Sequence, residues 1–248
     1  MPFANLLRSL SLLVAVAPGA GAATLELASP AERVALLELY TSEGCSSCPP
    51  ADRWLSAFRN DPRLWQRIVP VAFHVDYWNH LGWPDRFSDA RYTQRQHSCE
   101  RYGHLGFVYT PGFVFDGREW RGWFERRALP NSRPDKVGVL KATIDADTLT
   151  AVFEPLSKLA EPLTLNVALL AFDQSSDVKA GENRGKELHH DFVVVDWRQF
   201  PQPTTEDGLH WTLDGLPDRF PVNASGIALW ITAGDDPTPL QATGGYLK

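Results

Sequence analysis

Positive charge is in short supply along this chain. Its 24 lysines and arginines are outnumbered by 30 aspartates and glutamates, which gives a net charge of -6 and an isoelectric point near 5.6. Lysine and arginine form no long run. A nucleic-acid backbone is bound chiefly by basic side chains, so the charge balance argues against nucleic acid as a partner.

Long apolar stretches are also missing, apart from one near the amino terminus. Arg8 precedes an apolar run over residues 9–17, and Ala20-Gly21-Ala22 matches a small-x-small cleavage pattern. We therefore expect residues 1–23 to be a signal peptide and the mature protein to be periplasmic or secreted, without stable insertion in a membrane. The alternative is a retained membrane anchor, for which this run is short.

Cysteine is scarce as well, with three in 248 residues, but two of them lie close together. Cys45 and Cys48 follow an apolar run over residues 34–40, which is typical of a strand buried on both faces. Pro49-Pro50 then suits the first turn of a helix. A helix amino terminus favours a thiolate on Cys45, and the spacing lets Cys48 close a small disulfide ring. In an exported chain this pattern predicts a redox site, with Cys45 attacking and Cys48 resolving.

Two other chemistries fit the same cysteines. One is a purely structural disulfide. The other is a copper site made by Cys45, Cys48 and His74, because soft sulfur suits Cu(I). A closed zinc site fits less well, since it needs four ligands. The third cysteine, Cys99, has no partner near it in sequence and is expected to be a buried or lone thiol.

Strand and helix patterns alternate through the first half. A helix over residues 49–60 is followed by an apolar run over residues 68–75, which predicts a βαβ unit. A polar helix is expected over residues 88–102, with Ser88 as its N-cap. Asp116-Gly117 then indicates a hairpin turn.

Four side chains follow the second strand of this unit: His74, Asp76, Tyr77 and Trp78. Parallel strands place their carboxyl ends at one edge of a sheet, so we expect these side chains to share a cleft with the cysteine loop. The alternative is that His74 is a core histidine and that the aromatic rings cover the sheet.

The second half of the sequence has a different pattern, with short strand-like runs separated by Gly, Pro, Asp and Asn. This pattern predicts an antiparallel sandwich. Gly181–Gly185 is interpreted as a tight loop that docks against the first half. Because a strand alternates faces, His189 and His190 are not expected to point into one site. The strand-like runs cover residues 137–144, 148–153, 163–172, 186–197, 209–213 and 226–232.

The order strand, Cys-x-x-Cys, helix, strand, helix, Thr-Pro and hairpin resembles the thioredoxin fold. The resemblance implies that Pro111 is cis and that Thr110 and Pro111 lie against the disulfide. It also implies that the strand before the cysteines carries a buried acid, here Glu38, which we expect to relay a proton to or from Cys48.

Six motifs narrow the resemblance further, and in this order they are similar to the exported thioredoxin-like family catalogued as domain of unknown function 1223. Gly112 and Cys99 depart from that family, where glutamine and an aromatic residue are common. The motifs are Gly44-Cys45-Ser46-Ser47-Cys48-Pro49-Pro50-Ala51-Asp52, His74-Val75-Asp76-Tyr77-Trp78, Leu81-Gly82-Trp83, Arg95-Gln96, Tyr109-Thr110-Pro111 and Gly181-Glu182-Asn183-Arg184-Gly185.

The sequence thus predicts an α/β thioredoxin-like domain over residues 24–130, followed by an antiparallel β-sandwich domain over residues 131–248. The expected function is thiol–disulfide exchange with protein or small-molecule thiols, without a cofactor. The alternatives are a copper-binding or delivery protein, and a non-catalytic binding module with a structural disulfide.

Overall fold

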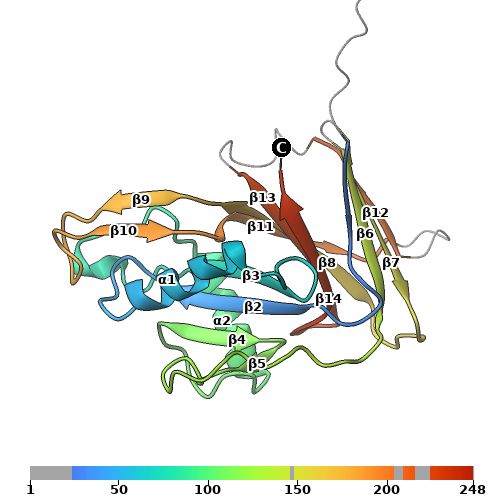
Figure 1. The fold of residues 1–248 in the computed structure, drawn as a ribbon, viewed down its shortest axis with the longest axis horizontal. Helices are drawn as coiled ribbons and strands as arrows, with labels where there is room; N and C mark the ends of the chain where they lie inside the picture. The colour runs from blue at the N-terminus through green and yellow to red at the C-terminus, as the bar shows by residue number, and fades with distance from the viewer. Residues whose placement is uncertain (1–23, 146–147, 204–208, 216–223, 248) are drawn as a thin grey trace, which may run out of the picture.

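Strands make up most of the fold (Figure 1). The computed structural model describes residues 24–145, 148–203, 209–215 and 224–247, so the expected signal peptide lies outside the described residues. The described part contains two α-helices, α1 (Pro49–Ser56) and α2 (Ala90–Arg101), and two single turns of 3-10 helix, η1 (Ala57–Asn60) and η2 (Asn79–Leu81). None of these helices has the length and apolar character needed to cross a membrane.

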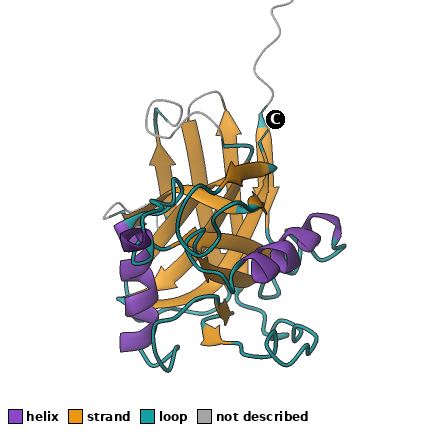
Figure 2. Ribbon diagram, turned by 90° about the vertical axis from the view of Figure 1, so that its left-hand side faces the viewer, coloured by secondary structure: helices purple, strands orange, loops and turns teal. Residues whose placement is uncertain are grey.

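One eight-stranded sheet runs through the centre of the molecule in the order β14-β13-β8-β11-β3-β2-β4-β5. Figure 2 shows helices on both sides of the strands. The central pair, β2 and β3, is buried along its whole length, which explains the continuous apolar runs in the sequence. The strands of this sheet are β2 (Ala35–Thr41), β3 (Ile68–His74), β4 (Gly112–Phe115), β5 (Arg118–Glu119), β8 (Leu163–Ala171), β11 (Val193–Pro201), β13 (Gly226–Ala233) and β14 (Asp236–Tyr246).

The local predictions for the first half are largely confirmed. β2 pairs in parallel with β3 around α1, as expected of a βαβ unit, and β4 joins the other edge of β2 in antiparallel fashion. The hairpin from β4 to β5 turns at Asp116 and Gly117, both with positive φ. The N-cap of α2 is Asp89, whose side chain accepts from Arg91 N, so the prediction of Ser88 was one residue early.

A second sheet packs against the β8 and β13 end of the first. Its strands alternate between core and solvent, and their inward side chains meet those of β8 and β13 in one apolar cluster. A separate two-stranded ribbon, β9 and β10, extends beside α1 (Figure 1). The second sheet has the order β1-β6-β7-β12, and the remaining bounds are β1 (Leu25–Ala28), β6 (Gly138–Asp145), β7 (Thr148–Pro155), β12 (His210–Leu213), β9 (Gln174–Asp177) and β10 (Glu187–His190).

The predicted fold class, an α/β thioredoxin-like domain followed by an antiparallel β-sandwich domain, is wrong. β3 is not an edge strand, because Val193 at the start of β11 pairs in parallel with Ala72. β11 then pairs with β8, and the sheet continues into β13 and β14. Strands from both sides of residue 130 therefore form one sheet in a mainly β structure. Apolar runs indicate that strands exist, but they do not specify which strand will pair with an open edge.

Candidate functional site

The two neighbouring cysteines lie in the turn between β2 and α1. Cys48 occupies the N-cap position of α1 and Pro49 begins the helix, so the helix starts where the sequence predicts. Backbone bonds from Cys45 N to Ser42 O and from Cys48 N to Cys45 O hold the turn. Both cysteines are free thiols, and they are almost completely buried, with 1% of Cys45 and none of Cys48 exposed.

The two thiols differ sharply in acidity. A hydrogen bond from Cys48, helped by Ser47 and Thr110, lowers the pKa of Cys45 to about 6. The Ser47 hydroxyl lies 3.3 Å from the Cys45 sulfur. Burial and the neighbouring Cys45 raise the pKa of Cys48 well above its ordinary value. One thiol is therefore set up as the nucleophile, and the other is kept protonated beside it.

The predicted partners Thr110, Pro111 and Trp78 do lie at the cysteine turn. The Thr110–Pro111 peptide bond is cis, as the resemblance implied. Thr110 hydrogen-bonds to Cys45 and also accepts a bond of 2.8 Å from the Trp78 indole N–H. Trp78 packs so closely on the turn that a Cβ on Gly44 would come within 2.9 Å of the Trp78 Cβ. Only glycine fits at that position.

Tyr77 and Asp76 connect this region to other elements. The Tyr77 hydroxyl donates to Gln96 Oε1 at 3.2 Å, and its ring lies close enough for Cys48 to raise its pKa beyond the effect of burial. Asp76 Oδ1 accepts a bond of 2.6 Å from the Thr93 hydroxyl of α2. Tyr77 therefore borders the thiols, whereas Asp76 serves to anchor α2.

Glu38 is buried, as expected, but its partners are Arg95 on α2 and Tyr40 on its own strand, β2. Its carboxylate accepts from Arg95 Nε at 2.6 Å and from the Tyr40 hydroxyl at 2.9 Å. The same hydroxyl lies 3.6 Å from Cys99, a buried free thiol whose pKa burial raises to about 12. The structure thus places Glu38 in an ion pair with Arg95 and does not bring it to the Cys48 sulfur.

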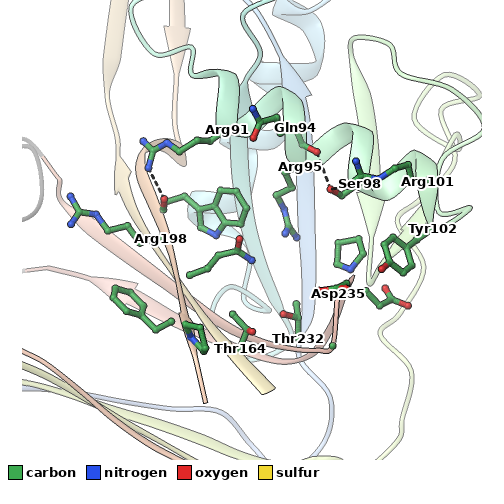
Figure 3. A pocket seen from close by; sticks show the side chains of 17 residues that line it. Arg91, Gln94, Arg95, Ser98, Arg101, Tyr102, Thr164, Arg198, Thr232 and Asp235 are labelled. Atoms are coloured by element: carbon green, nitrogen blue, oxygen red, sulfur yellow. Dashed lines mark hydrogen bonds between the residues drawn. The ribbon is translucent and has the colours of Figure 1, made fainter. Parts of the chain in front are cut away.

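Arg95 also lines a cavity of about 840 Å³ between α2 and strands β8, β11 and β13 of the eight-stranded sheet. Figure 3 shows its side chain extending from α2 toward Thr232. The guanidinium lies 5.2 Å from the Trp197 ring and 5.1 Å from the Trp230 ring. Arg95 therefore pairs with Glu38 and packs against two aromatic rings, which is a structural role.

A buried acid next to Cys48 is supplied instead by Asp52, which the sequence reasoning missed as a site residue. Asp52 comes four residues after Cys48, so it lies one helical turn along the same face of α1. Burial raises its pKa, and its charge raises that of Cys48. The i, i+4 spacing within the Cys-x-x-Cys helix was the available signal.

Asp52 belongs to a buried cluster of acids and histidines below the cysteine turn. His190 of β10 has one ring nitrogen 3.7 Å from Asp52 and the other 3.4 Å from Glu43. The Glu43 carboxylate also accepts from the Trp83 indole at 2.7 Å. Of the two adjacent histidines, only His190 is buried, as strand alternation predicted. Its role beside the cysteine turn was not foreseen, because the β9–β10 ribbon arrives from far along the chain.

His74 reaches the same cluster from the end of β3. Its Nδ1 lies 2.7 Å from Asp85 Oδ2, and its ring centre lies 5.0 Å from that of His190. Burial opposes charge on both partners, but their contact outweighs it, so the pKa of His74 is raised and that of Asp85 is lowered. Across the described ranges, no group of three or more His, Cys, Asp or Glu side chains is arranged so that it could hold a metal ion. The alternative copper site at Cys45, Cys48 and His74 stays a prediction.

The loop over Gly181–Gly185 covers the cysteine turn. Asn183, fully buried, donates from Nδ2 to the carbonyls of Glu43 and Cys45 at 2.8 and 2.9 Å. Glu182 accepts from the Ser46 backbone N–H at 2.9 Å. The expectation that this loop docks against the first half is confirmed, and it docks directly on the turn that carries the thiols.

Comparisons with known proteins support the fold and the family. A crystal structure of a protein from Agrobacterium tumefaciens, solved as a structural genomics target, is 24% identical, with a TM-score of 0.59 over 87% of this chain and 95% of that one. HBP35 of Porphyromonas gingivalis is 15% identical, with a TM-score of 0.54 over 87% of this chain and 76% of that one. No curated protein matches. The model of the family described as "Protein of unknown function (DUF1223)" matches residues 36–232, and the chain belongs to this family.

Proposed function

We propose that this protein is an exported thiol–disulfide oxidoreductase in which Cys45 and Cys48 exchange between dithiol and disulfide. The observation that carries the proposal is the difference in acidity between two adjacent thiols at one helix start. With a pKa of about 6, Cys45 is roughly nine-tenths thiolate at pH 7. Cys48 stays protonated, so it does not compete for the first attack.

The exchange then follows in two balanced steps. The Cys45 thiolate attacks one sulfur of a partner disulfide, a Cys45–partner disulfide forms, and the other partner sulfur leaves as a thiolate with the bonding electron pair. Cys48 next loses its proton and attacks the Cys45 sulfur, which releases the second partner thiolate. The Cys45–Cys48 pair is oxidised and the partner disulfide is reduced; with an oxidised Cys45–Cys48 pair the same steps run in reverse.

Asp52 is the group placed to accept the Cys48 proton. Its position one turn after Cys48 and its raised pKa both suit a carboxylate that gains a proton and later loses it. The His190 ring lies beside it, with Nδ1 3.7 Å from the Asp52 carboxylate. Export, which the amino-terminal sequence suggests, would put this chemistry in a compartment where disulfides persist.

The first test is the reduction potential of the pair, measured in glutathione buffers with Cys99→Ser in place. A value between about -270 and -120 mV is expected of an exchange catalyst. A value below about -300 mV would mark a structural disulfide and would overturn the proposal. In the same protein, alkylation of Cys45 should rise with pH about a midpoint near 6, because only the thiolate reacts.

A further inference from the structure

The segment over residues 118–134 has a charge unlike that of the rest of the chain. It contains five arginines and two glutamates, a net charge of +3 in a protein of net charge -6. It also carries Trp120, Trp123 and Phe124. Arginine and aromatic residues are the types most enriched where proteins bind one another.

This segment folds back against α1 and β4. The Trp120 ring lies 5.3 Å from that of Trp54 on α1, and the Trp123 ring lies 5.7 Å from that of Phe113 on β4. A cavity of about 470 Å³ lies between this segment and α1. It is lined by Pro50, Trp54, Trp123, Phe124, Arg126 and Arg127.

Exposed rings extend the cavity on its outer side. Phe107 and Phe124 are 52% and 46% exposed, although both are large apolar side chains. The Arg121 guanidinium lies within 5.6 to 6.0 Å of the rings of Phe107, Tyr109 and Phe124. We call the cavity and these rings together the aromatic–arginine surface, made of Pro50, Trp54, Phe107, Tyr109, Arg121, Trp123, Phe124, Arg126 and Arg127.

The aromatic–arginine surface is continuous in sequence with the thiol site on two sides. Pro50 follows Cys48 by two residues, and Tyr109 immediately precedes Thr110. Trp54 lies six residues beyond Cys48, which is about 9 Å along the helix axis. An extended polypeptide rises about 3.3 Å per residue, so about three residues cover this distance.

We propose that the aromatic–arginine surface binds a polypeptide segment with an aromatic side chain next to acidic residues, and that it presents a disulfide about three residues away to Cys45. This inference rests on the proposed function and names its substrate class. The ring enters the cavity beside Trp123 and Phe124, and the acidic side chains meet Arg126. The chemical steps are those given above, with the bound polypeptide supplying the disulfide that is reduced.

The choice of an acidic segment follows from the charges at the cavity. Arg127 pairs with Glu125 at 2.7 Å and Arg121 lies 3.3 Å from Glu119, so each has an acidic neighbour. Arg126 is exposed beside the apolar wall. A cationic segment would place like charge against it, whereas an acidic one gains attraction and faster association.

The test compares three synthetic peptides that each carry a glutathione mixed disulfide on cysteine, three residues after Asp-Asp-Trp, Lys-Lys-Trp or Asp-Asp-Ser. Full-length protein with Cys48→Ser traps the first mixed disulfide, and mass spectrometry gives the rate of its formation. The Asp-Asp-Trp peptide should react about tenfold faster than either of the others. Oxidised glutathione serves as the small substrate without an aromatic side chain.

Three variants assign the effect to the surface. Phe124→Ala should lower the rate with the Asp-Asp-Trp peptide about tenfold, and Arg126→Glu should reverse the preference between acidic and basic peptides. Arg67→Glu is the matched charge control. Arg67 is exposed and immediately precedes β3, whereas His74 is the last residue of that strand, so the substitution changes the charge at the other end of β3. All three should react with oxidised glutathione at the unmodified rate.

Binding of dye-labelled peptides without the disulfide separates docking from chemistry. Equal binding and equal rates for the three peptides would overturn the docking proposal while leaving exchange with oxidised glutathione intact. Selective binding of the Asp-Asp-Trp peptide without reaction of any disulfide would overturn the proposed exchange function and, with it, the presentation of a disulfide to Cys45.

Discussion

Replacing Asn183 by alanine should loosen the turn that carries the reactive thiols. The Asn183 side chain is fully buried, and its amide nitrogen donates to the carbonyls of Glu43 and Cys45. Alanine leaves both carbonyls without this donor. Cys45 O keeps its bond from Cys48 N, so only Glu43 O is left unsatisfied. A buried acceptor left unsatisfied costs about 1–3 kcal/mol, so Asn183→Ala should lower the free energy of unfolding by about 1–3 kcal/mol.

Urea denaturation of the reduced protein measures this loss. Alkylation of Cys45 by iodoacetamide measures the local effect, because this residue is only 1% exposed while the loop is in place. We expect faster alkylation in Asn183→Ala at a pH where the thiolate fraction is unchanged. A pH profile of the same reaction checks that the gain comes from access and not from a lower pKa.

Two further substitutions make the reasoning refutable. Asn183→Asp keeps the size but turns carboxylate oxygens toward two carbonyls, so it should destabilise the protein more than alanine does. Lys186→Met removes the contact of 2.8 Å between Lys186 Nζ and Asn183 Oδ1 and leaves the two bonds from the Asn183 amide in place. It should cost less than about 0.5 kcal/mol. A loss below about 0.5 kcal/mol for Asn183→Ala, equal to that control, would contradict the assigned role.

Two other predictions concern the buried acids. Asp52→Asn should slow the attack of Cys48 on the mixed disulfide at least about tenfold at pH 7, measured by stopped-flow fluorescence. The rate of Cys45 alkylation should not change. An unchanged rate of attack by Cys48 would show that Asp52 is not the proton acceptor. Glu38→Gln should instead leave this rate unchanged and lower stability by about 3 kcal/mol, since it leaves the Arg95 charge buried and unpaired. Adding Arg95→Met should recover part of that loss in a urea titration.

Local features of the cysteine region were predictable because they depend on short-range rules. The buried strand, the helix that starts at Pro49 and the Asp116-Gly117 turn each follow from the chemistry of a few adjacent residues. The alternation of β10 likewise placed one histidine inside and one outside. Such rules fix individual elements and the direction in which their side chains point.

The pairing of β11 with β3 was not predictable from the same rules. The two strands share the single register pair Val193 and Ala72, about 120 residues apart in the chain, and nothing in either apolar run selects the other. The prediction of Glu38 as the proton carrier was uncertain for a similar reason, because the sequence does not show which element will pack against its side chain. An acid on a strand can face either helix, and here Arg95 of α2 is its partner.

The long sequence separation between the cysteine turn and its covering loop bears on how the protein is made. Asn183 lies 138 residues after Cys45. At about 5–20 residues per second, synthesis needs roughly 7–28 s to extend the chain from one to the other. For that interval the nascent chain carries two uncovered thiols, open to any oxidant or isomerase that it meets. Coverage of the pair by this loop is therefore a late event of biogenesis.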